Sequence, residues 1–224
     1  MKSFMEILGN YNGEILEVVF LSIYVSISST CIASVIGIVS GVPTALKNFK
    51  LKKYIIRISE TLMSIPPVLM GLIIYLILSR RGPLGRFELL FTPTAMIIAQ
   101  SLLVLPIIFG LTISTIGKQG KEIQKNCIAL GASRRDILFS IVKESKVQLL
   151  SVMAVGFGRA ISEVGAVMMV GGNIRGETRV MTTFIALETG KGNFNEAIII
   201  GIILLSVSFI VNFILHKFKE ESMD

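Results

Sequence analysis

Histidine, cysteine and charged residues are scarce in this chain, which has one histidine, two cysteines and 17% charged side chains in 224 residues. Cys31, Cys127 and His216 are widely separated in the sequence and form no set of metal ligands. Any Ser-His-Asp arrangement would depend on His216, which is most simply an interfacial residue at the end of an apolar run. The sequence therefore predicts a protein that is not an enzyme, with no metal site and no cofactor.

A phosphate-binding loop is also missing. The stretch GLTISTIGKQG contains Gly117-Lys118, but Thr112 stands at the position of the first glycine, and Gln119 replaces the required serine or threonine. These replacements remove the nest of backbone amides and the magnesium-binding hydroxyl that nucleotide binding needs. If ATP drives this protein, another chain must hydrolyse it.

Long apolar runs are abundant. Hydrophobic residues make up 52% of the sequence, and the mean hydropathy is +0.75. About 20 apolar residues are needed to cross about 30 Å of hydrocarbon. Five runs of that length are present, at 18–40, 54–78, 92–116, 147–171 and 195–215. We therefore expect an all-α integral membrane protein with about five transmembrane helices in one domain. Acidic residues interrupt the N-terminal flank, so it does not resemble a cleavable signal peptide.

The basic residues predict the orientation in the membrane. Fourteen lysines and arginines lie after the first and third runs and in the C-terminal tail, against seven on the other side. Because basic residues are enriched in cytoplasmic loops, the N-terminus is predicted outside and the C-terminus inside. The expected divisions are an extracytoplasmic segment at 1–14, a membrane domain at 15–215 with a cytoplasmic loop at about 118–146, and a cytoplasmic tail at 216–224. The net charge of +7 is thus mostly a topology signal. It does not indicate nucleic-acid binding, since no aromatic residues interleave a basic patch.

Prolines and charges interrupt three of the runs. Pro66 and Pro67 remove amide donors and force a kink in the second run, and Pro106 kinks the third. Such kinks either line a permeation path or only improve helix packing. In the fourth run, Arg159 and Glu163 are four residues apart and are expected to share a helix face. This pair either rigidifies the bundle or lines or gates a path, and the two roles are compatible.

The polar stretch IQKNCIALGASRRDILFSIVKESK, between the third and fourth runs, predicts two short helices separated at a glycine. Gly131 supplies the left-handed geometry that ends a helix. Ser133 and Asp136 resemble a capping box at the start of the second helix. Its apolar residues fall on one face: Ile137, Leu138, Ile141 and Val142. A compact basic helix pair between membrane spans indicates a docking site for a soluble partner.

This stretch resembles the cytoplasmic coupling loop of permease subunits in ATP-binding-cassette importers. That loop reads roughly Glu-Ala-Ala, three residues, Gly, nine residues, Ile, one residue, Leu-Pro. Gly131 and Ile141 match it, whereas residues 125–127 read Lys-Asn-Cys and 143–144 read Lys-Glu. The resemblance implies ATPase coupling by Leu130, Gly131, Ala132, Ser133, Arg134, Arg135, Asp136, Ile137, Leu138 and Ile141.

A second resemblance covers about residues 15–215. The stretch GRAISEVGAVMMVGGNIRGETRVMTTFIALETGKG is similar to permeases for tetrahedral oxyanions, which have an Ala-Arg-Ala-X-X-Glu-X-Gly-Ala core followed by Gly-Asn-Ile. SIPPVLMGL and RRGPLG also resemble this group. GAVMMVGGNI, ALETGKG and the Lys-Glu at 143–144 look most like its tungstate-specific branch. The matching positions are Arg159, Glu163, Gly165, Ala166, Asn173, Ile174, Gly176, Glu177 and Thr178.

The resemblance implies a type I importer permease fold and a permease subunit that imports an oxyanion, most simply tungstate, with molybdate or sulfate as alternatives. Its expected partners are a second copy of the chain, a cytoplasmic ATPase, an extracytoplasmic oxyanion-binding protein and the lipid bilayer of the cell membrane. The anion would be delivered to the outer face, which carries Arg80, Arg81, Arg175 and Arg179. The path or gate would use Pro66, Pro67, Arg159, Ser162, Glu163, Gly165 and Asn173.

Two other classes of protein are alternatives. A secondary transporter or channel would work alone, but the sequence shows no convincing internal repeat of the kind common in secondary transporters. A membrane assembly factor could bind a soluble partner through the same amphipathic loop. It would not need the proline pair or the glycine-rich, polar fourth run.

Overall fold

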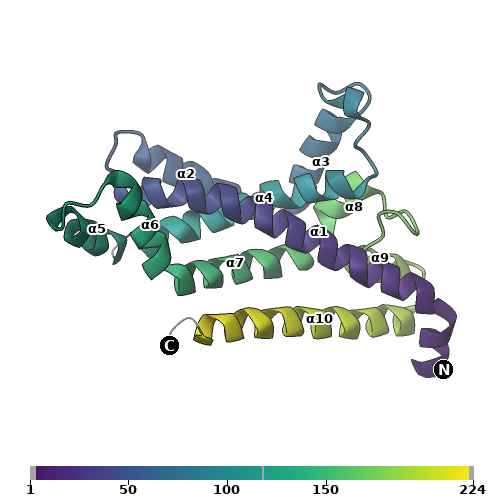
Figure 1. The fold of residues 1–224 in the computed structure, drawn as a ribbon. Coiled ribbons are helices and arrows are strands. Elements are labelled where there is room, and N and C mark those ends of the chain that lie inside the picture. Colours follow the sequence, from purple (N-terminus) through teal and green to yellow (C-terminus); the bar gives the residue numbers. More distant parts are fainter. Residues whose placement is uncertain (1–3, 118, 222–224) are drawn as a thin grey trace.

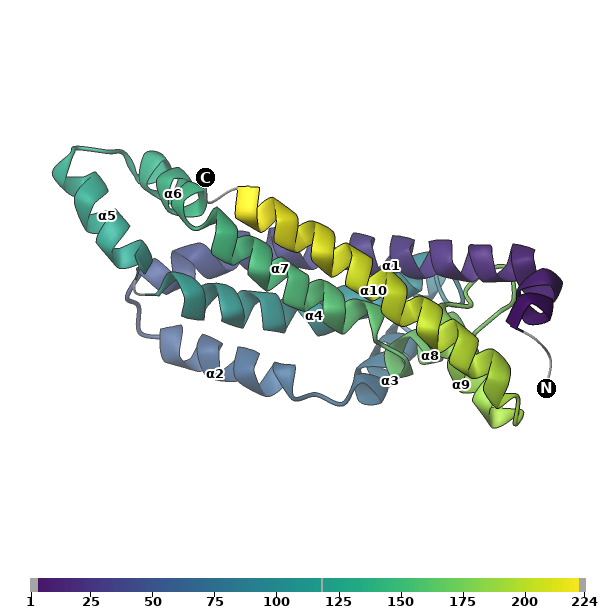
Figure 2. The same cartoon turned by 90° about the horizontal axis from the view of Figure 1, so that it is seen from below.

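The computed structural model describes residues 4–117 and 119–221, and every regular element in this part of the chain is a helix. Four long helices run along the length of the molecule (Figures 1 and 2). They are α1 (Phe4–Leu46), α4 (Pro93–Ile116), α7 (Lys146–Ile161) and α10 (Phe194–Glu221). The shorter helices are α2 (Lys52–Met63), α3 (Pro67–Leu78), η1 (Gly85–Phe87), α5 (Gln119–Ala129), α6 (Arg134–Glu144), α8 (Gly165–Gly171) and α9 (Met181–Gly190). The all-α prediction is confirmed.

The five predicted membrane runs correspond to three straight helices and two bent pairs. Gly13–Leu46, Pro93–Ile116 and Phe194–Leu215 are each long and apolar enough to cross a membrane. The second run is divided into α2 and α3, and the fourth into α7 and α8. Helix α1 also extends back over most of the predicted segment 1–14. The prediction of about five spans therefore holds when each bent pair is counted as one span.

The two bent pairs break for different reasons. Helices α2 and α3 meet at 100°, and the break contains Pro66 and Pro67, which cannot donate the backbone hydrogen bonds of a continuing helix. Figure 1 shows α3 turning away from the direction of α2. Helices α7 and α8 meet at 59° with no proline between them. Arg159 and Glu163 were predicted to share a helix face, but α7 ends at Ile161 and Glu163 lies in the break beyond it. The two side chains still form a pair.

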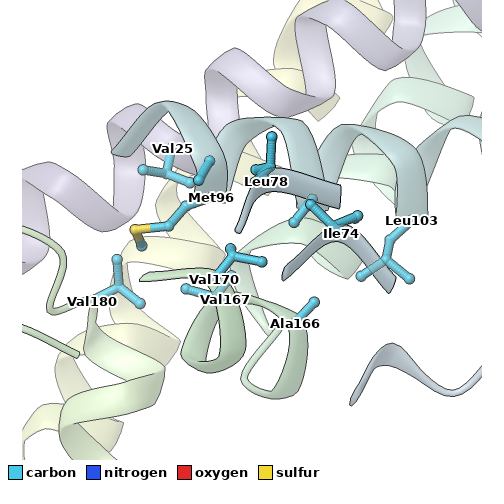
Figure 3. Packing of buried hydrophobic residues seen from close by; sticks show 11 residues of the cluster. Val25, Ile74, Leu78, Met96, Leu103, Ala166, Val167, Val170 and Val180 are labelled. Carbon is cyan, nitrogen blue, oxygen red and sulfur yellow. The ribbon is translucent and has the colours of Figure 1, made fainter. Parts of the chain in front are cut away.

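The short helices α3 and α8, which follow the two breaks, pack directly against each other. A Cβ built on Gly71 of α3 would lie 2.7 Å from Cα of Ala166 in α8, so only glycine permits this approach. The contact continues into an apolar cluster shared with α1 and α4 (Figure 3). Its labelled members are Val25, Ile74, Leu78, Met96, Leu103, Ala166, Val167, Val170 and Val180. The two breaks are thus joined by a common core.

The ends of the molecule differ in character. Helices α5 and α6 lie at one end with the last turns of α10, whereas α9 and the first turns of α1 lie at the other (Figures 1 and 2). Helix α10 packs along α7 and α9 and leaves much of its apolar surface exposed. In a membrane protein such a surface suits contact with lipid or with another helix.

We predict that Gly71→Ala lowers the stability of the purified protein. The added methyl would force α3 and α8 apart, and overpacking of this kind costs about 1–3 kcal/mol. Gly201→Ala in α10 is the matched control, because a Cβ there meets nothing within 4 Å. Thermal unfolding in detergent should show a lower midpoint for the first variant only. Equal midpoints for the two variants would contradict the close approach of α3 and α8.

Candidate functional site

The break between α7 and α8 is organised by one ion pair. Arg159 Nη1 lies 2.6 Å from Glu163 Oε2, and Glu163 Oε1 accepts a hydrogen bond from the backbone amide of Ala166 at 3.1 Å. Glu163 is buried, whereas the side chain of Arg159 is 35% exposed. The carboxylate therefore pairs with the last turn of α7 and satisfies an amide in the first turn of α8.

Polar side chains from two other helices satisfy the backbone of this break. Gln100 of α4 donates from Nε2 to the carbonyl of Ala160 at 3.0 Å, and its Oε1 accepts from Ser29 of α1 at 3.0 Å. Thr182 of α9 donates to the carbonyl of Glu163 at 2.8 Å. In a membrane interior such freed carbonyls need partners from the protein or from water. Reading the sequence missed Gln100 and Thr182, since neither belongs to a local motif.

The structure brings most of the predicted path residues together. A Cβ on Gly165 would lie 2.6 Å from Cγ2 of Val68, the residue that follows Pro67, so the two breaks meet where α3 and α8 begin. Ser162 lies at the same break and is exposed, with its hydroxyl donating to the carbonyl of Gly158 at 2.9 Å. Asn173, the remaining predicted path residue, does not lie at either break.

Asn173 lies beyond the far end of α8. It adopts a left-handed backbone with φ of 54°, and its Nδ2 donates to the carbonyl of Thr183 at 3.4 Å. Asn173 therefore connects α9 to the turn after α8, one helix away from the two breaks.

The predicted helix–glycine–helix segment is formed by α5 and α6. Gly131 has φ of 78° with no atom within 4 Å of a built Cβ, so its role is conformational. Ser133 accepts a hydrogen bond from the amide of Asp136, whose carboxylate accepts one from the amide of Ser133. The capping box that the sequence indicated is therefore present.

Helix α6 is held to the bundle by one apolar face. Ile137 and Ile141 are buried in a cluster with α1, α4 and α7, and Leu138 borders a cavity of about 310 Å³ between α6 and the end of α1. Phe139 is 71% exposed and shares the outward face with Arg135. We define Arg135, Phe139 and Val142 as the outward face of α6. Val142, predicted to share the apolar face of Ile137 and Ile141, is 38% exposed and lies outside their buried cluster. Phe139 was missed, although its spacing from Arg135 and Val142 places all three on one helical stripe.

The opposite end of the molecule carries the four arginines that the sequence placed outside. Arg80 and Arg81 border a cavity of about 500 Å³ at the end of α3. Arg175 and Arg179, after α8, both pair with Glu14 of α1, at 2.7 and 2.6 Å. No sequence motif linked Glu14 to these arginines, which are more than 150 residues away in the chain.

A second buried carboxylate lies near this cluster. Glu188 of α9 accepts hydrogen bonds from Lys191 and Asn193, each at 2.7 Å. Burial acts to raise the pKa of the Glu188 carboxyl, but the hydrogen bonds from Asn193 and Lys191 and the positive charges of Lys191 and Arg179 outweigh it and lower the pKa. Glu188 is therefore a fixed negative charge beside Arg179.

These features define a multi-pass helical membrane protein whose broken spans meet inside the bundle and whose polar helix pair lies at one end. The chain matches the model of the family described as binding-protein-dependent transport system inner membrane component over residues 33–221. It belongs to this family of inner-membrane transport subunits, in which ATP hydrolysis resides on a separate subunit.

Individual relatives agree with this assignment. The chain is 44% identical to the tungstate uptake system permease protein TupB of Peptoclostridium acidaminophilum, over 97% of this chain and 95% of that protein. It is 42% identical to the protein of the same name from Campylobacter jejuni, over 76% of this chain and 72% of that protein. It is 34% identical to a probable anion ABC transporter permease protein of Haloferax volcanii, over 93% and 92% respectively.

We predict that Glu163→Gln destabilises the protein by roughly 2–3 kcal/mol. Arg159 would lose its countercharge, and breaking a fully buried pair costs about 3–5 kcal/mol, a figure reduced here by the partial exposure of Arg159. Glu60→Gln, at an exposed site on α2, is the control for the same chemical change. Thermal unfolding of both variants in detergent tests the prediction, and an unaltered midpoint for Glu163→Gln would contradict it.

Proposed function

We propose that this chain forms, as a pair of identical copies, the membrane path of an importer for a tetrahedral oxyanion, with tungstate as the substrate. A separate ATPase docks on the α5–α6 segment at the cytoplasmic end, and a binding protein delivers the anion at the α9 end. Membership of the transport family carries this proposal. The 44% identity with a permease named for tungstate uptake, over nearly the whole chain, supports the substrate.

The construction of α6 supports its role in coupling. A helix that transmits motion must be attached rigidly on one side and open to its partner on the other. Ile137 and Ile141 attach α6 to three spans, while the outward face presents an aromatic ring beside charged residues. Aromatic and arginine side chains are the residue types enriched at protein interfaces. The capping box and Gly131 fix where the helix starts, so its direction is defined.

The surface of α2 supports a path between two copies. Its outward side exposes Arg57, Glu60 and Thr61, and Ser64 follows it. Charged side chains facing lipid are costly, so such a surface suits a water-filled space or another protein chain. An apolar cavity of about 320 Å³ opens beside it, between α1, α2 and α4. A second copy packed over this side would enclose a polar path along the breaks.

The scarcity of fixed positive charge inside the spans fits transport of a dianion. Arg159 is neutralised by Glu163, so a passing oxyanion meets mainly hydroxyl and amide groups near the breaks. A dense cluster of arginines would hold the anion instead of releasing it, because charge-assisted hydrogen bonds to oxyanions are strong. Selectivity would then reside mainly in the binding protein.

We predict that deleting the gene abolishes high-affinity uptake of radiolabelled tungstate by cells that express the partner subunits. Excess molybdate and sulfate should compete weakly in the parent strain. Strong competition by molybdate would widen the substrate class without altering the transport role. Unchanged uptake in the deletion strain would contradict the proposed function and favour a membrane assembly factor.

We predict that Gly131→Val uncouples ATP hydrolysis from transport while the protein still inserts into the membrane. Valine strains the left-handed backbone, at a cost of at least 1–2 kcal/mol, although the site has room for its side chain. Gly131→Asn is the matched control, since asparagine tolerates this conformation. ATPase activity and uptake in reconstituted vesicles should separate in the valine variant and remain linked in the asparagine variant.

A variant of the outward face tests the docking surface directly. Phe139→Ala should weaken binding of the ATPase by at least tenfold, because an exposed aromatic anchor would be lost. Phe209→Ala, at an equally exposed phenylalanine on α10 (72%, against 71% for Phe139), is the matched control and should have no effect. Co-purification of the ATPase with each variant measures the difference, and equal retention by both would place the docking surface elsewhere.

A further inference from the structure

Glu14, Arg175 and Arg179 form a compact cluster, which we call the outer clamp. The two guanidinium groups bind different oxygens of the same carboxylate, Arg175 to Oε2 at 2.7 Å and Arg179 to Oε1 at 2.6 Å. The carboxylate comes from α1, whereas both arginines come from the turn between α8 and α9. Two guanidinium groups that converge on one oxyanion are also the arrangement that binds sulfate-like anions.

The two arginines differ in how exposed they are and in what their side chains contact. Arg179 is held in place, since only 14% of its side chain is exposed and its guanidinium lies 5.6 Å from the centre of the Phe184 ring. Its Nε is buried with no hydrogen-bond partner in the described structure, so one donor of the clamp is unused. Arg175 is 71% exposed, so an incoming group can reach its guanidinium from the solvent.

A purely structural role for the two ion pairs does not account for the presence of both arginines at Glu14. An ion pair to an arginine as exposed as Arg175 contributes at most about 1 kcal/mol. The Glu14 carboxylate, which is only 7% exposed, would neutralise the largely buried Arg179 alone. The exposed second arginine therefore leaves the clamp with an excess positive charge. Glu188, beside Arg179, remains occupied by Lys191 and Asn193, and Glu177 on the same turn is exposed.

We propose that the outer clamp is a receiving site for the transported oxyanion, and that Glu14 occupies it as a built-in competitor when no anion is present. The inference rests on the proposed oxyanion transport and deepens it. A tetrahedral dianion displaces the Glu14 carboxylate and accepts hydrogen bonds from the guanidinium groups of Arg175 and Arg179, including the unused Nε of Arg179. The dianion then balances the two positive charges of these arginines. When the anion leaves, Glu14 returns, so the arginines do not retain the anion.

Competition by Glu14 also explains how two arginines, which are strong hydrogen-bond donors to anions, can lie on a transport route. Two unopposed arginines would bind an oxyanion tightly and slow its release. An attached carboxylate is present at high effective concentration, so it lowers the apparent affinity without removing the recognition chemistry. The clamp is thereby suited to brief occupancy between the binding protein and the breaks.

The test is equilibrium binding of radiolabelled tungstate to the purified permease–ATPase complex in phosphatidylcholine nanodiscs, with molybdate and sulfate measured in parallel. Glu14→Gln removes the competing charge and should tighten binding of at least one of these anions more than tenfold. Glu17→Gln, one turn away on the exposed side of α1, is the matched control and should leave binding unchanged. Adding Arg175→Ala to Glu14→Gln should abolish the gain.

Each outcome decides the proposal. Unchanged affinity of Glu14→Gln for all three anions overturns it, whether or not the melting temperature falls. If Glu14→Gln does not fold, Arg175→Ala alone decides, because losing an ion pair as exposed as this one costs at most about 1 kcal/mol. It should raise the concentration for half-maximal uptake at least threefold, and an unaltered uptake curve overturns the proposal.

The proposed function and the clamp can fail separately. A gain in affinity for sulfate or molybdate but not tungstate would retain the clamp and correct the substrate. Loss of tungstate uptake on gene deletion, together with no gain in any Glu14→Gln binding assay, would retain the transport role and reject the clamp.

Discussion

The fold depends on one requirement, which is that backbone groups freed by a break inside the membrane must find partners within the protein. At the break between α7 and α8 this requirement is met by side chains from three separate elements. Gln100 of α4 serves the carbonyl of Ala160, Thr182 of α9 serves the carbonyl of Glu163, and the Glu163 side chain serves the start of α8. The bend is therefore fixed by tertiary contacts and not by helix propensity. The carbonyl of Ala160 also accepts a hydrogen bond from the amide of Glu163 at 3.1 Å, so the side chains of Thr182 and Glu163 are the partners whose loss would leave a backbone group unsatisfied where water is scarce.

The two breaks form one mechanical unit. Because α3 and α8 touch through Gly71 and Gly165, neither half-helix can shift without moving the other. Protein interiors are close-packed and transmit displacement instead of absorbing it. Helix α7 links this unit to α6 through the residues around Ser145, where one helix follows the other directly. A displacement of α6 is thus transmitted to the two breaks through a single helix, α7.

Local patterns in the sequence were sufficient for much of this structure. Apolar runs predicted the spans, the proline pair predicted one break, and Gly131 with the Ser133–Asp136 box predicted the helix pair. These features depend on neighbours within a few residues. The break at Ser162 and the partners of Gln100 and Glu14 depend on residues 60 to 165 positions apart. A single sequence does not contain that pairing information, so these contacts appear only once the helices are assembled.

Helices α5 and α6 are 11 residues each, which is below the length at which an isolated helix is stable in water. Their helicity therefore depends on the cluster that holds Ile137 and Ile141 against the spans. A free peptide with this sequence would be largely unstructured and a poor mimic of the segment. The surface exists only on a permease whose spans have already assembled. Any soluble subunit that recognises it thereby selects correctly folded copies, and this imposes an order on the biogenesis of the complex.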